Sequence, residues 1–149
     1  MLIAAILVLS AGCSGDNPVS DFEYKYDATA GGIVITKYIG TSIKVKIPKK
    51  IEGEFVVWIG DNAFIHSGIM EVYIPNSITN IGDYAFWNCT GLKNVAIPDS
   101  VTKIRYTSFA CYKLTATYKG KTYHAEKREG DPNVPYNMPS EFYDTINGR

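Results

Sequence analysis

Apolar residues recur along the middle of the chain at a fixed spacing of 23 positions. The segment Glu71 to Phe86 reads EVYIPNSITNIGDYAF, and the segment Asn94 to Phe109 reads NVAIPDSVTKIRYTSF. An earlier, looser copy runs from residue 47 to 64 and carries an insertion of about five residues near 53–57. A period of this length predicts a solenoid, in which each copy buries its apolar face against its neighbours.

Each copy of the repeat is predicted to form short strands joined by turns. Val95 and Ile97 alternate with polar or small residues, as in a half-buried strand. The proline after each Ile ends the strand, because it has no backbone N–H to donate. A Gly-Asp pair then turns the chain, and Asp61 and Asp83 are placed to cap one helical turn that bears Ala-Phe. Three aromatic rings are expected to stack inside the coil: Phe64, Phe86 and Phe109.

The segments on both sides of the repeats are predicted to cap the solenoid. Residues 21–26 and 33–39 flank a glycine-containing loop and predict a β-hairpin. Residues 118–123 form a compact turn between two short strands, and 139–147 predict a helix that stops at Gly148. We expect a hairpin cap plus repeat domain over 22–118 and a C-terminal cap over 119–149, since terminal repeats must be covered to stay soluble.

The N-terminus has the features of a secretion signal of the lipoprotein type. Residues 1–9 are a continuous apolar run that is too short to span a bilayer, and Ser-Ala-Gly leads into Cys13. We expect residues 1–12 to be a signal peptide, Cys13 to be lipidated, and residues 13–21 to be a flexible polar tether. The alternative is a buried N-terminal strand.

The repeat sequence IGDYAFWNCTGLKNVAIPDSVTKI resembles the BspA-like subclass of leucine-rich repeats, which is found in bacterial surface proteins and some protists. The resemblance covers roughly Tyr38 to Tyr118. It implies a leucine-rich-repeat solenoid, mostly β with short helical turns, wound as a right-handed coil of about three repeats. In the final copy Thr117 and Lys119 fall where Val95 and Ile97 stand, so we expect the solenoid to close there.

Composition and the reactive side chains argue against catalysis and against nucleic acid as a partner. Lysine plus arginine equals aspartate plus glutamate at 15 each, whereas a nucleic-acid binder normally has a basic excess. His66 and His124 lie on unlike elements, and no nucleophile has a base beside it in the pattern. We therefore expect no enzyme activity, no metal and no cofactor. Cys89 and Cys111 occupy corresponding turns and are expected as free buried thiols, with a disulfide as the alternative.

The outward side of the repeat strands is the candidate ligand-binding face. Its side chains are expected to stack in two rows, one of Lys44, Glu71 and Asn94, the other of Lys46, Tyr73, Ala96 and Tyr118, with Lys93 beside them. Lysine and tyrosine together suit contact with protein or glycan, and the alternative is an ordinary solvated face. The resemblance implies adhesion to host extracellular protein or to other cells, and with the predicted lipid anchor the first hypothesis is a membrane-anchored binding module at the cell surface. The second hypothesis is a structural spacer or assembly component of a cell-envelope complex.

Overall fold

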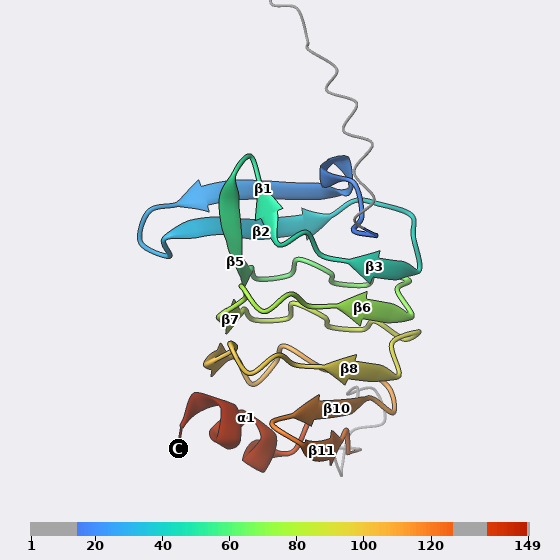
Figure 1. Ribbon diagram of the computed structural model, residues 1–149. Coiled ribbons are helices and arrows are strands. Elements are labelled where there is room, and N and C mark those ends of the chain that lie inside the picture. Colours follow the sequence, from blue (N-terminus) through green and yellow to red (C-terminus); the bar gives the residue numbers. More distant parts are fainter. Residues whose placement is uncertain (1–14, 127–136, 149) are drawn as a thin grey trace, which may run out of the picture.

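The chain winds in stacked coils that place strands on two sides of a shared core (Figure 1). The computed structural model describes residues 15–126 and 137–148. One side is a sheet with the order β1-β2-β5-β7-β9, and β4 pairs with β5; the other side consists of the pair β3-β6 and the triplet β8-β10-β11. The elements are η1 (Val19–Asp21), β1 (Phe22–Asp27), β2 (Gly32–Tyr38), β3 (Lys44–Lys46), β4 (Lys50–Ile51), β5 (Glu54–Ile59), β6 (Glu71–Tyr73), β7 (Asn80–Ile81), β8 (Asn94–Ala96), β9 (Lys103–Ile104), β10 (Thr115–Tyr118), β11 (Lys121–His124) and α1 (Ser140–Asn147).

The hairpin that the sequence predicts from residues 21–26 and 33–39 is present, and the insertion in the first repeat adds a second hairpin that was not predicted. β1 and β2 pair antiparallel around the loop of residues 28–31. The insertion in the first repeat forms the antiparallel pair β4-β5, which turns at Glu52 and Gly53, both with positive φ. The insertion therefore extends β5 and leaves the rest of that coil in register with the next, because Ile59 still pairs with Ile81.

The core is a column of aromatic rings inside the coils, as the repeat predicts. Phe86 is fully buried and lies between Phe64 and Phe109, with ring centroids 4.9 Å away on each side and interplanar angles of 12° and 3°. Tyr38 extends the column upward at 5.3 Å from Phe64, and Phe142 of α1 closes it below at 6.2 Å from Phe109. Each ring covers the next, so apolar burial depends on neighbouring coils rather than on one repeat.

The predicted helical turn after each Gly-Asp is wrong. Residues 61–66 and 83–88 form hydrogen-bonded turns instead, in which Asn62 and Tyr84 take a left-handed backbone conformation with φ of 60° and 55°. Asp61 does not cap a turn of its own coil. Its side-chain Oδ1 accepts a hydrogen bond from the backbone N of Asp83 in the next coil, at 2.8 Å. The aspartate thus ties neighbouring coils together, which periodicity along one repeat does not reveal.

The final repeat pairs with the preceding one, but the residue opposite Val95 is Ala116 and not Thr117, which the comparison of repeat sequences predicts. Ala116 pairs with Val95 and Thr117 with Ala96, so the alternation puts Ala116 and Tyr118 inside and Thr117 outside. Tyr118 is 2% exposed, and its hydroxyl donates to the carbonyl oxygen of Val101 at 2.9 Å. The shorter spacing of this last copy shifts the match from Thr117 to Ala116.

The C-terminal segment covers the lower end of the solenoid, as expected. Helix α1 ends at Gly148, which adopts a left-handed conformation with φ of 71°. Phe142, Tyr143 and Ile146 of the helix are buried against the last coil. Asn147 closes the open edge of β9: its Nδ2 donates to the Ile104 carbonyl oxygen at 2.9 Å, and its Oδ1 accepts from the Ile104 N at the same distance.

The segment before the first hairpin covers the free edge of β3. The predicted flexible tether over residues 13–21 is therefore wrong for its last part. Asn17 lies alongside β3, where its backbone N donates to the Lys46 carbonyl oxygen at 3.0 Å and its side-chain Oδ1 accepts from the Lys46 N at 2.8 Å. Residues 17–21, including the turn η1, are therefore part of the folded edge rather than a free leash. The signal peptide over residues 1–12 and the lipidation site Cys13 lie outside the described residues.

Candidate functional site

The outer surface of β3, β6, β8 and β10, here called the strand face, is built by the period-2 alternation of these strands. Val45 and Val95 point into the core and are almost fully buried, so their neighbours on each strand point outward. The pairing Lys44 to Glu71 and Lys46 to Tyr73 aligns β3 with β6, and Asn94 to Thr115 aligns β8 with β10. The outward side chains are Lys44, Lys46, Glu71, Tyr73, Asn94, Ala96, Thr115 and Thr117.

The strand face contains six of the eight side chains that the sequence assigns to it. The six are Lys44, Lys46, Glu71, Tyr73, Asn94 and Ala96. Lys93 lies just before β8, at the margin of the face, and Tyr118 belongs to the core. Thr117 lies beside Ala96, in the place that the sequence predicts for Tyr118, and Thr115 extends the row of Asn94. Both threonines point outward because Ala116 between them is buried.

The charged side chains of the strand face are largely occupied with one another or with the backbone. Lys44 Nζ lies 2.8 Å from Glu71 Oε1, and both side chains are about two-thirds exposed, so the pair adds little stability. Lys93 Nζ donates to the carbonyl oxygens of Thr90 and Tyr112, at 2.8 and 3.2 Å. Its charge therefore stabilises the turn before β8 and is less available to a ligand than the sequence suggests.

The strand face is interrupted between β6 and β8. β3 pairs with β6 and β8 pairs with β10, but no strand ladder joins β6 to β8 among the described residues. At this break Val72 is only partly buried, whereas Val45 and Val95 at the equivalent positions are 1% and 3% exposed. The interruption therefore opens apolar core surface toward solvent at one place on the strand face.

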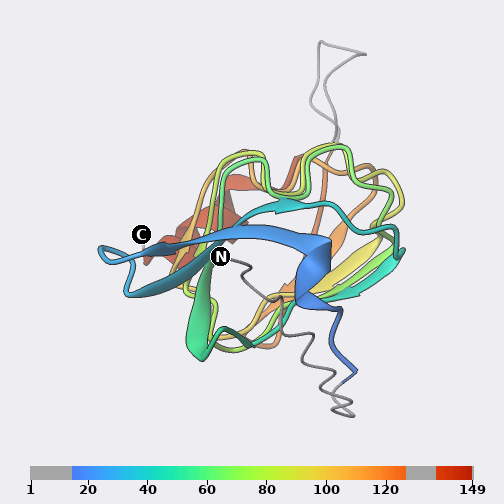
Figure 2. The ribbon, with the colours of Figure 1, turned by 90° about the horizontal axis from the view of Figure 1, so that it is seen from above.

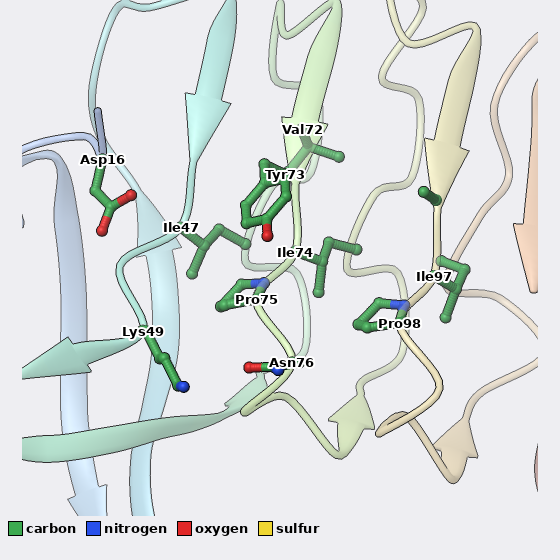
Figure 3. A pocket seen from close by; sticks show the side chains of 11 residues that line it. Asp16, Ile47, Lys49, Val72, Tyr73, Ile74, Pro75, Asn76, Ile97 and Pro98 are labelled. Carbon is green, nitrogen blue, oxygen red and sulfur yellow. The ribbon is translucent and has the colours of Figure 1, made fainter. Parts of the chain in front are cut away.

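A groove of about 440 Å³ occupies this break and continues to the turns that follow the strands (Figure 3). Tyr73 stands beside it with 62% of its surface exposed, the most exposed of the large apolar side chains in the described part of the chain. The stacked prolines that end the strands form part of its lining, with Lys49 and Asp16 at one end. The lining residues are Asp16, Ile47, Lys49, Val72, Tyr73, Ile74, Pro75, Asn76, Ala96, Ile97 and Pro98.

Sequence reasoning identified Tyr73 but not the groove. The repeat itself stacks Pro75 over Pro98 and Ile74 over Ile97, so the apolar lining could have been inferred from the Ile-Pro period. The break between β6 and β8 could not, because the local sequences of both strands match the repeat equally well. The combination of an exposed aromatic ring, an apolar floor and a few polar groups is typical of a recognition surface.

The side chains capable of chemistry are dispersed and engaged in structural contacts. His66 Nδ1 lies 2.9 Å from the Asn88 side-chain amide, and His124 Nδ1 lies 3.1 Å from the Thr115 hydroxyl. Cys89 and Cys111 are free and fully buried, as expected, and their thiols donate to the carbonyl oxygens of Phe64 and Phe86. The neighbouring Cys111 side chain, together with burial, raises the pKa of the Cys89 thiol, which favours its protonated form.

No group of three or more histidine, cysteine, aspartate or glutamate side chains is placed to hold a metal ion in the part of the chain that the structure describes. In the same residues, no helix is long and apolar enough to cross a membrane.

Solved structures of leucine-rich-repeat proteins from three bacteria are similar to this chain. A leucine-rich cell surface protein of Faecalibacterium prausnitzii is 32% identical with a TM-score of 0.50; the match covers 61% of this chain and 27% of that one. A leucine-rich repeat protein of Bacteroides capillosus is 23% identical with a TM-score of 0.51, covering 69% of this chain and 97% of that one. A Treponema pallidum leucine-rich repeat protein is 21% identical with a TM-score of 0.42, covering 60% and 64%. This chain thus spans about a quarter of the F. prausnitzii protein and under two-thirds of the T. pallidum one.

Family membership follows from the repeats themselves. No curated protein matches the chain. The family model of the BspA type leucine rich repeat region, built from six copies of the repeat, matches residues 43–124, which is more than half of the chain. These residues contain the stacked strands, the Ile-Pro turns and the phenylalanine column described above. The chain belongs to the BspA-type leucine-rich-repeat family.

Proposed function

We propose that the protein is a non-catalytic extracytoplasmic binding module that holds a protein or glycan ligand at the cell surface through its strand face. The observation that carries this proposal is Tyr73, a strongly exposed ring beside an apolar groove at the break between β6 and β8. Aromatic residues next to a desolvated pocket are the usual anchors of a binding surface. The F. prausnitzii relative, which is described as a cell surface protein, supports the location.

The ligand is expected to bind in the micromolar range or more weakly. The groove is small and the strand face is only four strands wide, so a single contact buries limited surface. Tyr73 and the groove can supply the apolar centre, and the outward lysines, Asn94 and the threonines the polar rim. Adhesion through many copies on one surface would suit such an affinity, because multivalent contact multiplies weak binding.

Replacing Tyr73 with alanine should weaken ligand binding at least about tenfold, because it removes the exposed anchor beside the groove. The measurement is a binding screen of the purified protein against immobilised matrix proteins and a glycan panel, followed by titration of each positive ligand. Tyr84→Ala is the matched control: Tyr84 is 44% exposed but lies in a turn between β7 and β8, away from the groove.

Three results of this screen would separate the hypotheses. Binding that is lost in Tyr73→Ala and kept in Tyr84→Ala supports the strand face. Binding that is equally sensitive to both changes, or insensitive to Tyr73→Ala, contradicts it. If no ligand binds and the protein reproducibly co-purifies with a cell-envelope partner, the role as a structural spacer or assembly component replaces the binding module.

We also propose that Cys13 is lipidated and anchors the domain in the membrane. The support is the apolar run of residues 1–9 followed by Ser-Ala-Gly-Cys. Two or more acyl chains on one cysteine would make the attachment durable. Wild-type protein should fractionate with membranes and begin at a lipid-modified Cys13 by mass spectrometry, whereas Cys13→Ser should be released. An intact Met1 in the wild type, or membrane retention of Cys13→Ser, would overturn the anchor without affecting the strand face.

A further inference from the structure

The outer edge of β1 is an open edge of the larger sheet (Figure 1). β1 pairs with β2 on one side, and no described strand pairs with its other side. Two other sheet edges are closed by asparagine side chains, Asn17 on β3 and Asn147 on β9. β1 is six residues long and contains neither proline nor glycine. An open edge of this length carries unpaired backbone donors and acceptors and is a template for another strand.

The side chains of β1 alternate between charged and aromatic residues. Glu23 and Lys25 are both exposed and lie on the same face of the sheet, since they are two positions apart. Tyr24 and Tyr26 lie on the opposite face, where Tyr26 is 58% exposed. Asp27, the last residue of β1, lies on the same face as Glu23 and Lys25, and its Oδ1 accepts hydrogen bonds from the backbone N of Thr29 and Ala30. This face of the edge thus presents two negative charges and one positive charge, with Asp27 already bonded to the adjoining loop.

We propose that a second copy of this chain is the partner of this edge, with the two β1 strands paired antiparallel about a two-fold axis at Tyr24. The charge pattern and the length of paired strand together select this arrangement among those that keep paired side chains on the same face. An axis at Tyr26 would place Lys25 opposite the partner's Asp27, but it would pair only residues 25–27 of β1, because the loop begins at residue 28. An axis at Glu23 places Glu23 opposite the partner's Glu23, and an axis at Lys25 places Lys25 opposite the partner's Lys25. Only the axis at Tyr24 places Glu23 opposite the partner's Lys25, and it does so twice.

The energetic reason for this register lies in direct cross-strand pairs. Opposite charges that face each other across neighbouring antiparallel strands stabilise the pairing, whereas like charges destabilise it. The same register brings Phe22 opposite the partner's Tyr26, and aromatic pairs are among the favourable cross-strand contacts. Within the chain itself Glu23 already faces Lys37 of β2, so the alternation of charge continues across the joined sheet.

The dimer leaves the strand face free, because β1 belongs to the other sheet and lies at one end of the stack (Figures 1 and 2). A dimer would carry two strand faces, so it would bind a surface that displays many ligands more tightly than one chain does. The inference does not depend on the proposed function. Loss of dimerisation leaves the affinity of a single strand face unchanged, and loss of Tyr73 leaves the dimer unchanged.

Charge reversal on the edge tests the proposal. Sedimentation equilibrium of the purified full chain, up to about 1 mM because an interface of this size is weak, should show a monomer–dimer equilibrium. Lys25→Glu should raise the dissociation constant at least tenfold, since it creates two like-charged pairs, and Glu23→Lys should do the same. The double variant Glu23→Lys/Lys25→Glu should return it to within about threefold of the wild type.

Lys103→Glu is the matched control, since Lys103 is an exposed lysine of β9 in the same sheet. It should leave the dimer unchanged. A wild type that stays monomeric at every concentration overturns the proposal. So does a dimer that ignores Lys25→Glu, or one that the double variant fails to restore. Slower hydrogen exchange of β1 amides with rising concentration should accompany the dimer; exchange that slows only when an unrelated extended peptide is added would instead assign the edge to another protein.

A cysteine at the axis tests the register directly. Opposed residues of antiparallel strands have Cα atoms about 4.5–5.5 Å apart, which suits a disulfide. In a Cys13→Ser background, Tyr24→Cys should cross-link to a covalent dimer with oxidised glutathione, which accepts the two electrons and protons of the two thiols. Glu23→Cys should not, because its own counterpart lies on the diagonal at about 7–8 Å. Cross-linking of Glu23→Cys in preference to Tyr24→Cys would overturn the register.

Discussion

Replacing Phe86 with alanine is expected to lower the free energy of unfolding by about 3–5 kcal/mol, as for a fully buried aromatic ring whose removal leaves a cavity. Phe86 has no exposed surface and contacts rings of the coils above and below at 4.9 Å. A cavity at this position interrupts the column in its middle, and neither neighbouring coil can close it without losing its strand register. Urea titration of the wild type and the variant, followed by circular dichroism, measures the change.

Phe55→Ala is the control for that experiment. Phe55 is an aromatic residue of the inserted hairpin and is 45% exposed, with the ammonium groups of Lys49 and Lys50 at 5.8 and 4.3 Å from its ring centroid. Its loss is expected to cost about 1 kcal/mol or less. If Phe86→Ala unfolds at the same urea concentration as Phe55→Ala, the phenylalanine column is not the main source of stability.

Phe142→Ala should also lower the free energy of unfolding by about 3–5 kcal/mol. The loss of stability should be concentrated in the last coil of the solenoid. Phe142 is fully buried and joins α1 to the last coil through edge contacts with Phe109 and Tyr123, at 6.2 and 5.2 Å. Without it, the lower ring of the column is uncovered and Asn147 loses its position at β9. A repeat protein deprived of its cap is least stable at the uncapped end.

Hydrogen exchange resolved by segment is the measurement for this second variant. The amides of β9 and β10 should exchange faster in Phe142→Ala, while those of β2 and β5 keep more of their protection. Uniform acceleration across all strands would show that the domain unfolds as one unit. Unchanged protection at β9 and β10 would show that α1 is not the cap of the solenoid.

The features that follow from the repeat could be predicted from the sequence. The 23-residue period places Phe64, Phe86 and Phe109 in one column and the Ile-Pro turns in another, since equivalent residues of stacked coils must lie together. The β1-β2 hairpin, the turn between β10 and β11 and the helix ended by Gly148 were also predictable, because glycine and alternating apolar residues act locally.

The features that depend on contact between coils were not predictable in the same way. Asp61 matches a helix cap locally, but its carboxylate bonds to the next coil. By its sequence spacing from Ala96, Tyr118 is predicted to join the row of outward side chains. The final repeat is shorter, however, so Thr117 pairs with Ala96 and the Tyr118 side chain points inward, where its hydroxyl donates to the Val101 carbonyl oxygen. Asn17 lies in a polar stretch typical of a tether, and only the open edge of β3 explains its position.

The candidate site likewise contains features that follow from single strands and features that arise only between coils. Tyr73 and the lysines were found from alternation within single strands. The groove was not, because it arises where β6 and β8 part and leave Val72 half covered. The interruption leaves partly uncovered an apolar side chain that a regular ladder would hide, which is why we propose ligand contact at this place.

Photo-cross-linking in the cells that produce the protein is the most direct test of the claim that the strand face is the binding surface. A photoreactive phenylalanine analogue is placed at position 73 or, in a separate variant, at position 84, and the covalent adducts are identified by mass spectrometry. We expect a specific protein or glycan adduct from position 73 and none from position 84. Adducts from position 84 alone, or the absence of any adduct from position 73 in cells where the protein is fully exposed to its surroundings, would contradict the account.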